Sequence, residues 1–152
     1  MKREPDFMWN PEAGVATCVI EDNFGRTHVG VAACHPEDHD MMTDKVGCEI
    51  AFMRAEIAAL QAYIRDDLKP GLAALKQLYY SMKHSTKFSP KSYEAIMLYR
   101  QMRIKEEDIA YMKEIINMRK QALKTYIDRK DEFYIKTRRG REFAAQANND
   151  QS

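Results

Sequence analysis

Two cysteines and two histidines lie close together in the sequence. Cys34 and His35 are adjacent, His39 follows, and Cys48 comes nine residues after His39. Thiolate and imidazole are ligands that zinc prefers, so these four side chains could form a tetrahedral site. Their spacing matches none of the usual zinc motifs, and the sequence has no C-x-x-C pair. We therefore interpret the segment as a polar loop leading into a helix, with Cys48 in the core, and expect neither metal nor other cofactor.

Nucleophilic catalysis needs a thiol or hydroxyl beside a base that a third group orients. Cys34 and His35 are neighbours, so in an extended chain their side chains point to opposite sides. Cys18 could lie opposite His28 across a β-hairpin, but no residue is evident that would orient this pair. The sequence also has no Gly-rich phosphate loop. These patterns predict a protein that is not an enzyme.

Cations and aromatic rings alternate in the last third of the chain. Such a surface suits nucleic acid or a nucleotide, because cations meet phosphate and rings stack on bases. Acidic residues at positions 128, 131 and 132 interrupt it, and any long helix needs a solvated face. The surface therefore supports an alternative function, in which the chain holds a ligand. Its members are Arg119, Lys120, Lys124, Tyr126, Arg129, Lys130, Tyr134, Arg138 and Arg139.

The net charge of +1 over 152 residues conceals an asymmetry. Residues 1–67 carry 13 acidic and six basic side chains, whereas residues 68–152 carry 10 acidic and 18 basic ones. Two such halves could attract each other between subunits, or present a basic surface to an acidic partner. No apolar run is long enough to cross a membrane, and the start does not resemble a signal peptide. Three cysteines, an odd number, suggest reduced thiols in a cytoplasm.

The first part of the chain predicts a β-hairpin followed by a helix. Residues 15–20 and 27–34 are rich in β-branched and small residues, and the polar turn between them contains Gly25. Residues 1–10 look like a loose lead-in. From 46 to 64, apolar residues recur at alternating steps of four and three, which predicts a helix over about 43–67 with Thr43 as its N-cap.

The rest of the chain predicts two more helices. Lys69-Pro70-Gly71 either ends the first helix or kinks it, and a short helix and link then occupy 68–88. Ser89 and Pro90 predict the start of a long amphipathic helix over 89–138, and 139–152 should form a flexible tail. The predicted fold class is mainly α (α+β): a β-hairpin packed on a helix in 1–67, then a helical hairpin with one very long, coiled-coil-like helix.

An apolar track follows the long helix at heptad-like spacing. We expect it to be a helix-pairing or oligomer interface, within one chain or between chains. Its main residues are Ile109, Met112, Ile116, Leu123 and Phe133. Further apolar residues, among them Ile104, Tyr111 and Met118, widen this face.

Residues 14–55 contain two further motifs, GVAACHPEDHD from Gly30 to Asp40 and GCEIAFMRA from Gly47 to Ala55. On these residues the segment resembles a module of small bacteriophage and prophage proteins. The module is a strand pair, a C-x-P-x-D-like turn and a helix with G-x-x-I-A and R-A. It covers about a quarter of the chain and implies a viral setting in the cytoplasm of a host cell.

The function expected from all of this is stoichiometric binding to a host protein. The chain would be a non-enzymatic phage accessory protein, a host-takeover or anti-defence inhibitor, acting as a homo-oligomer. The alternative is a protein that holds a signalling nucleotide or nucleic acid on its basic-aromatic helix. Neither expectation includes a membrane.

Overall fold

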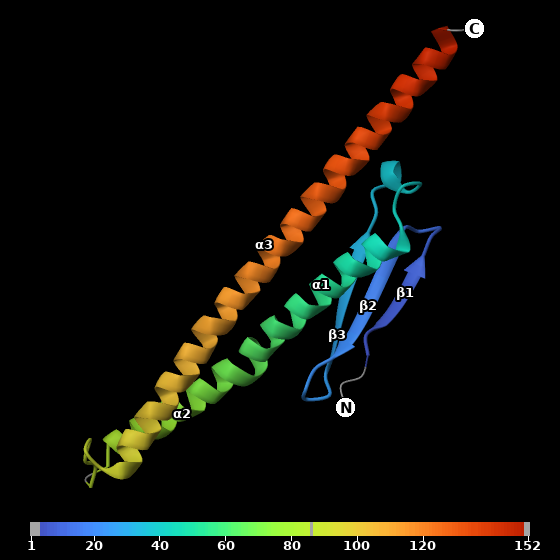
Figure 1. Ribbon diagram of the computed structural model, residues 1–152. Helices are drawn as coiled ribbons and strands as arrows, with labels where there is room; N and C mark the ends of the chain where they lie inside the picture. Colours follow the sequence, from blue (N-terminus) through green and yellow to red (C-terminus); the bar gives the residue numbers. More distant parts are fainter. Residues whose placement is uncertain (1–3, 86, 151–152) are drawn as a thin grey trace. The chain divides into compact units, whose positions relative to one another are not determined.

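The computed structural model describes residues 4–85 and 87–150. It divides the chain into two compact units. The sheet unit comprises residues 1–56 and 119–152, and the helical unit comprises residues 57–118. The fold is mainly helical with an N-terminal antiparallel sheet (Figure 1), so the predicted fold class, mainly α with an α+β arrangement, is confirmed.

The sheet has three strands, β1 (Asp6–Asn10), β2 (Val15–Glu21) and β3 (Thr27–Ala33), in the order β1-β2-β3. The predicted hairpin of β2 and β3 is present. The lead-in is not loose throughout, because Asp6–Asn10 pairs antiparallel with β2. This strand has only five residues, but alternate side chains on it reach the core: Trp9 packs against the buried cluster, whereas Met8 is exposed.

Small side chains line the inner face of the sheet, where the first turns of α1 (Asp44–Tyr63) cover it (Figure 1). A side chain at Gly30 would meet the backbone, because its Cβ would lie 1.9 Å from the carbonyl oxygen of Ala51. Glycine at this position therefore lets helix and sheet touch. The buried cluster at this contact consists of Ala16, Cys18, Ala32, Ile50, Ala51 and Ala55.

Helix α1 begins as predicted, with the Val46 N–H donating to Thr43 Oγ1 at 3.3 Å. At its other end, the sequence predicted that Pro70 either ends the helix or kinks it, and the structure contains elements of both. The backbone stays helical beyond Tyr63, but as a π-helical turn over Ile64–Leu68, before α2 (Lys69–Lys83) starts with Pro70 in its first turn. The Lys69 N–H donates to the Ile64 carbonyl, so the wider turn adapts the helix to the missing N–H of Pro70.

Helix α3 extends over Tyr93–Asp150, which corrects both predicted ends. Ser92 caps it, with the Ala95 N–H donating to its Oγ at 3.3 Å, whereas Ser89 belongs to the preceding turn. The helix also continues through 139–150, where a flexible tail was expected. Residues 151 and 152 of that predicted tail lie outside the described residues.

In the helical unit, α2 packs against the first half of α3. Tyr79 of α2 makes ring contacts with Tyr99 and with Phe88 of the connecting loop, at centroid distances of 6.4 and 6.0 Å. Lys76 and Glu106 form an exposed ion pair at 3.7 Å. These contacts show that the predicted helical hairpin forms within one chain.

We predict that Gly30→Ala lowers the free energy of unfolding by about 3 kcal/mol, because the added methyl group cannot fit against the Ala51 carbonyl. Gly140→Ala is the matched control. That glycine lies in an exposed helix with nothing within 4 Å of an added Cβ, so the change should stabilise by about 0.5–1 kcal/mol. Urea denaturation of both variants measures the difference. Equal stabilities would contradict the close contact.

Candidate functional site

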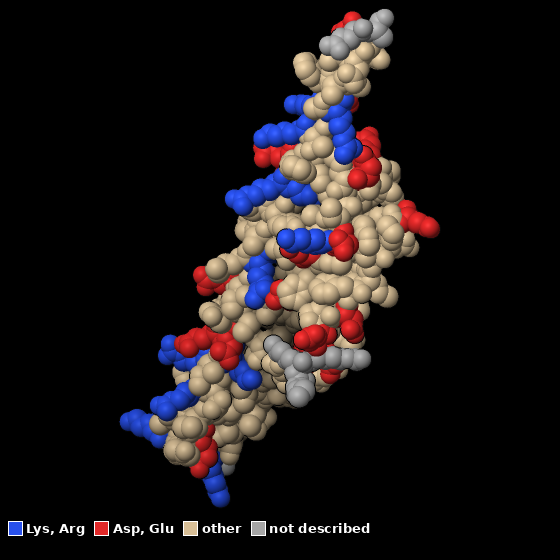
Figure 2. Space-filling model, turned by 45° about the vertical axis from the view of Figure 1, so that its right-hand side comes forward, with Lys and Arg blue, Asp and Glu red and all other residues tan. Residues whose placement is uncertain are grey.

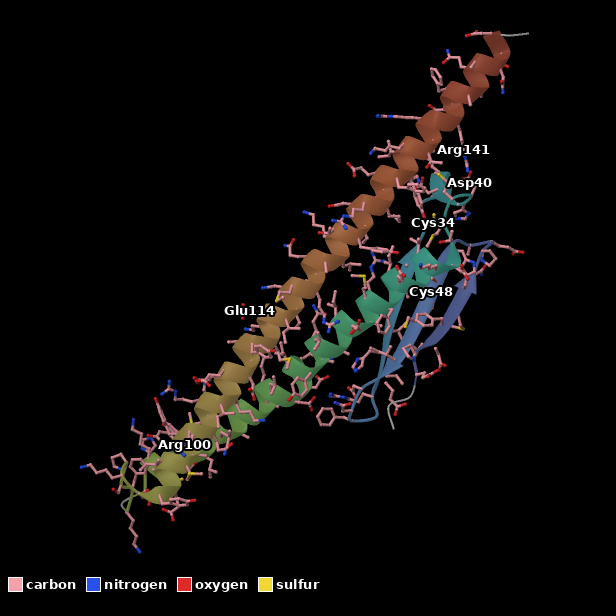
Figure 3. The ribbon with its side chains drawn as sticks, viewed as in Figure 1. Cys34, Asp40, Cys48, Arg100, Glu114 and Arg141 are labelled. Carbon is pink, nitrogen blue, oxygen red and sulfur yellow. The ribbon has the colours of Figure 1, made fainter. Side chains whose placement is uncertain are left out.

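The structure does not bring the four candidate zinc ligands, Cys34, His35, His39 and Cys48, together as one group. Within residues 4–85 and 87–150, no three His, Cys, Asp or Glu side chains come together to hold an ion. His35 Nδ1 accepts the Glu37 N–H at 3.3 Å and so caps the 3₁₀ turn Pro36–Asp38. Cys48 was expected to be buried, and it lies half-buried on α1 against the core. Figure 3 shows Cys34 and Cys48 on separate elements.

The cysteines are poorly placed for nucleophilic chemistry. Cys18 does not lie opposite His28, because the strand register pairs Cys18 with Gly30 and Ile20 with His28. Burial raises the pKa of the Cys18 thiol, and it also raises the pKa of Cys34 and of Cys48. The neutral thiol is therefore favoured at each position, and a neutral thiol is a weak nucleophile.

A charged cluster holds the turn between β2 and β3. His28 Nε2 lies 2.8 Å from Asp22 Oδ2, and Arg26 Nε donates to the same oxygen at 2.9 Å. The N–H groups of Phe24 and Arg26 donate to the other oxygen of Asp22. The hydrogen bond with His28, followed by the backbone and Arg26 bonds, holds the pKa of Asp22 well below its ordinary range. These contacts fix the conformation of the β2–β3 turn. They account for the presence of an acid, a base and a histidine together at this position without a catalytic role.

The predicted basic-aromatic surface is divided by the fold. Five of its nine members are held by contacts in the sheet unit. Arg119 donates to Glu56 at 2.7 Å, and the Tyr126 hydroxyl donates to the Glu49 carboxylate. Lys130 lies over the ring of buried Tyr134, with its Nζ 5.4 Å from the centroid. The fifth, Arg138, pairs with the loop after β3. Lys120, Lys124, Arg129 and Arg139 remain exposed.

Two arginines of α3 reach the acidic loop between β3 and α1. Arg138 Nη1 lies 2.8 Å from Glu37 and 3.3 Å from Asp38, and Arg141 pairs with Asp40 (Figure 3). The acidic and basic halves of the sequence therefore meet inside one chain. Over the face in Figure 2, Lys and Arg are interleaved with Asp and Glu. Charge asymmetry was the only sequence signal for these pairs, whose partners are up to 101 residues apart.

The rings of both aromatic members, Tyr126 and Tyr134, are engaged in the fold and are not available to stack on a base. Burial, together with the hydrogen bond to Glu49, raises the pKa of Tyr126 to about 12, so its hydroxyl stays a neutral donor. Burial also raises the pKa of Tyr134, which has only 3% of its surface exposed. A nucleotide would have to bind on the exposed cations alone.

Most side chains of the predicted interface track are buried or half-buried by the same chain. Ile109 and Ile116 are buried in the helical unit, Met112 is half-buried, and Leu123 packs against the core of the sheet unit. Phe133 differs, since its ring is exposed. As a surface for self-association, this track is therefore largely occupied, and its pairing is intramolecular.

The outer face of the sheet is an exposed surface that the sequence did not single out. Met8 and Val31, one on each edge strand, expose 65% and 45% of their surface, and Val29 is similarly exposed. A shallow hollow lies beside β1 on this side, lined by Met8, Trp9, Asn10, Ala13, Val15 and Thr17. Alternation along β3 places Val29 and Val31 on one face of the hairpin, but alternation alone does not show whether a helix covers that face.

Comparisons with known proteins add no family to these observations. No protein-family model matches the chain, and no match was found among the curated proteins or the solved structures. The resemblance of residues 14–55 to phage modules therefore stays a prediction. Among the described residues, no helix is both long and apolar enough to cross a membrane.

We predict that Asp22→Asn destabilises the fold at neutral pH and has less effect in acid. The pKa of Asp22 is lowered in the folded state, so its contribution is fully present above the ordinary pKa of an aspartate, about 3.9, and declines as the pH falls below that value. Urea midpoints at several pH values for wild type and variant test this. A midpoint difference that does not depend on pH would contradict the ionised cluster.

Proposed function

We propose that this chain acts without catalysis, by stoichiometric binding of another protein to the outer face of its sheet. The observation that supports this most directly is the exposure of Met8, Val29 and Val31 on that one face, where Thr17 of β2 lies between Met8 and Val31. Side chains of this kind normally lie under a helix or a second sheet. An exposed apolar surface with a polar rim is typical of an interaction site.

The rim of this face suggests the chemistry of the partner. The three strands contain two acidic residues, Asp6 and Glu21, and no Lys or Arg. A cation does lie on the β3 side, where Arg54 of α1 donates to the Val31 carbonyl at 2.7 Å. Glu4 and Glu12 lie exposed nearby in the sequence. Two copies stacked through this face would bring carboxylates together, which is unfavourable. A partner with an apolar centre and Lys or Arg around it would be complementary.

The size of the face limits the strength of the contact. Three strands about 4.8 Å apart, with seven residues rising about 3.4 Å each, cover roughly 14 by 24 Å. That is smaller than the roughly 800 Å² that each partner contributes to a standard stable interface. The partner should therefore also contact the hollow beside β1 and the loop that precedes β2.

The setting of this interaction follows from the sequence resemblance. On that basis we propose a host or defence protein in the cytoplasm of an infected cell as the partner, and inhibition as the outcome. The alternative, a nucleotide or nucleic acid on α3, has less support because Tyr126 and Tyr134 are engaged within the chain.

We predict a specific one-to-one complex through β3. A photo-crosslinking residue in place of Val31 should yield one adduct in host cells, and the same residue in place of exposed Ala144 should not. Once the partner is identified and purified, Val31→Asp should weaken binding by about tenfold or more in calorimetry, because it buries a charge, whereas Ala144→Asp should bind like wild type.

Two outcomes would contradict this proposal. One is a partner that crosslinks equally from both positions, and the other is unchanged affinity for Val31→Asp. A gel shift with single-stranded DNA or RNA that disappears in the double variant Lys124→Ala, Arg129→Ala would instead favour the ligand-binding alternative.

A further inference from the structure

A second apolar row runs along α3 within the helical unit. It consists of Met97, Ile104, Tyr111 and Met118, which are spaced seven residues apart. Tyr111 and Met118 expose 60% and 67% of their surface, and Ile104 is also exposed. Seven residues are almost two full helical turns, so the row stays on one side of the helix. It lies about 100° around the helix from the buried track that contains Met112.

Charged residues follow one flank of this row. Arg100, Glu107 and Glu114 each stand four residues before a member of the row, which places them beside it along α3. All three are exposed, and they make no hydrogen bond or ion pair with other described residues. Figure 3 marks Arg100 and Glu114 on the helix. The flank is thus basic at its N-terminal end and acidic farther along.

We propose that this row binds a second copy of the chain, with the two α3 helices antiparallel and the two-fold axis near Glu107. In this arrangement Arg100 of each copy lies beside Glu114 of the other, so that two ion pairs form across the interface. Ile104 and Tyr111 fill the centre, and Met97 lies near Met118 of the second copy. A parallel pair would bring Arg100 toward Lys105 of the second copy, which is a like-charge contact.

The same geometry imposes a cost at the axis. Glu107 of one copy meets Glu107 of the other, and two carboxylates repel each other at close range. The row is also interrupted by polar Gln101 and Asp108. Contacts over residues 97–118 would extend along only about 33 Å of helix. These features are suited to a weak, reversible dimer. The row shares no residue with the outer face of the sheet, so this inference does not rest on the proposed function.

Substitutions that reverse the charges of Arg100 and Glu114 test the antiparallel dimer. We expect sedimentation equilibrium of the full chain at low salt to show a reversible dimer. Arg100→Glu should weaken it about tenfold, because two ion pairs become two repulsions. Glu114→Arg should do the same, and the double variant should return to wild-type affinity. Glu107→Gln should tighten the dimer because it removes the repulsion at the axis.

Other results would overturn the proposal: a monomer at every concentration, single variants that dimerise like wild type, or a double variant that is no better than the single ones. All three positions are exposed, so far-UV circular dichroism should confirm that each variant folds. Val31→Asp should dimerise like wild type, which separates this test from that of the sheet face.

Cysteine crosslinking tests the direction of the pair. Only a residue close to a two-fold axis lies beside its own counterpart in an antiparallel dimer. Glu107→Cys should therefore form a disulfide-linked dimer on mild oxidation, and Met118→Cys should not, with wild type as the control for its three native cysteines. Efficient crosslinking through Met118→Cys, or none through Glu107→Cys, would overturn the antiparallel arrangement.

Discussion

The close contact between Gly30 and the backbone of α1 is the constraint on which the sheet unit depends. With the Ala51 carbonyl where a Cβ would stand, the helix can approach only over a surface of alanine, cysteine and glycine. Trp9 and Ile20 pack beside this small-residue patch on the same face, whereas Val29 and Val31 alternate to the opposite face. The exposed valines therefore lie on the face opposite the α1 contact, and this is the surface that we propose for binding.

Electrostatics ties the end of the chain to its beginning. Arg119, Arg138 and Arg141 of α3 meet carboxylates of α1 and of the loop after β3. Each pair is partly or largely exposed, so individually each contributes little stability. Within the sheet unit they join the second half of α3 to α1 and to the loop after β3, and they leave fewer cations for other molecules. A surface that looked suited to nucleic acid in the sequence becomes an intramolecular contact, which lowers the support for a ligand on α3.

Features that depend on contacts between residues close in the sequence could be predicted, and features that depend on contacts between distant residues could not. The β2–β3 hairpin, the Thr43 cap and the long helix follow from neighbouring residues, and the structure contains all three. Strand β1 was missed because its five residues, between two prolines, are too few to show a clear alternation of apolar and polar side chains. Its strand conformation depends on pairing with β2. The Cys18 and His28 pairing failed because register depends on the turn, where Asp22 sets the geometry. Ion pairs between residues about 100 positions apart leave no local pattern at all.

Helix α3 shows why an apolar pattern alone does not identify an interface. In the sequence, Ile104, Tyr111 and Met118 only widened a face centred on Ile109 and Ile116. The fold buries that centre within the chain and leaves the widening residues exposed, so one broad face becomes two rows with different neighbours. An apolar row with exposed aromatic and thioether side chains is costly in water unless something covers it. The charges along its flank reverse sign from Arg100 to Glu114. This reversal favours an antiparallel copy of the same helix as the cover, because each Arg100 then lies beside a Glu114 of the other copy.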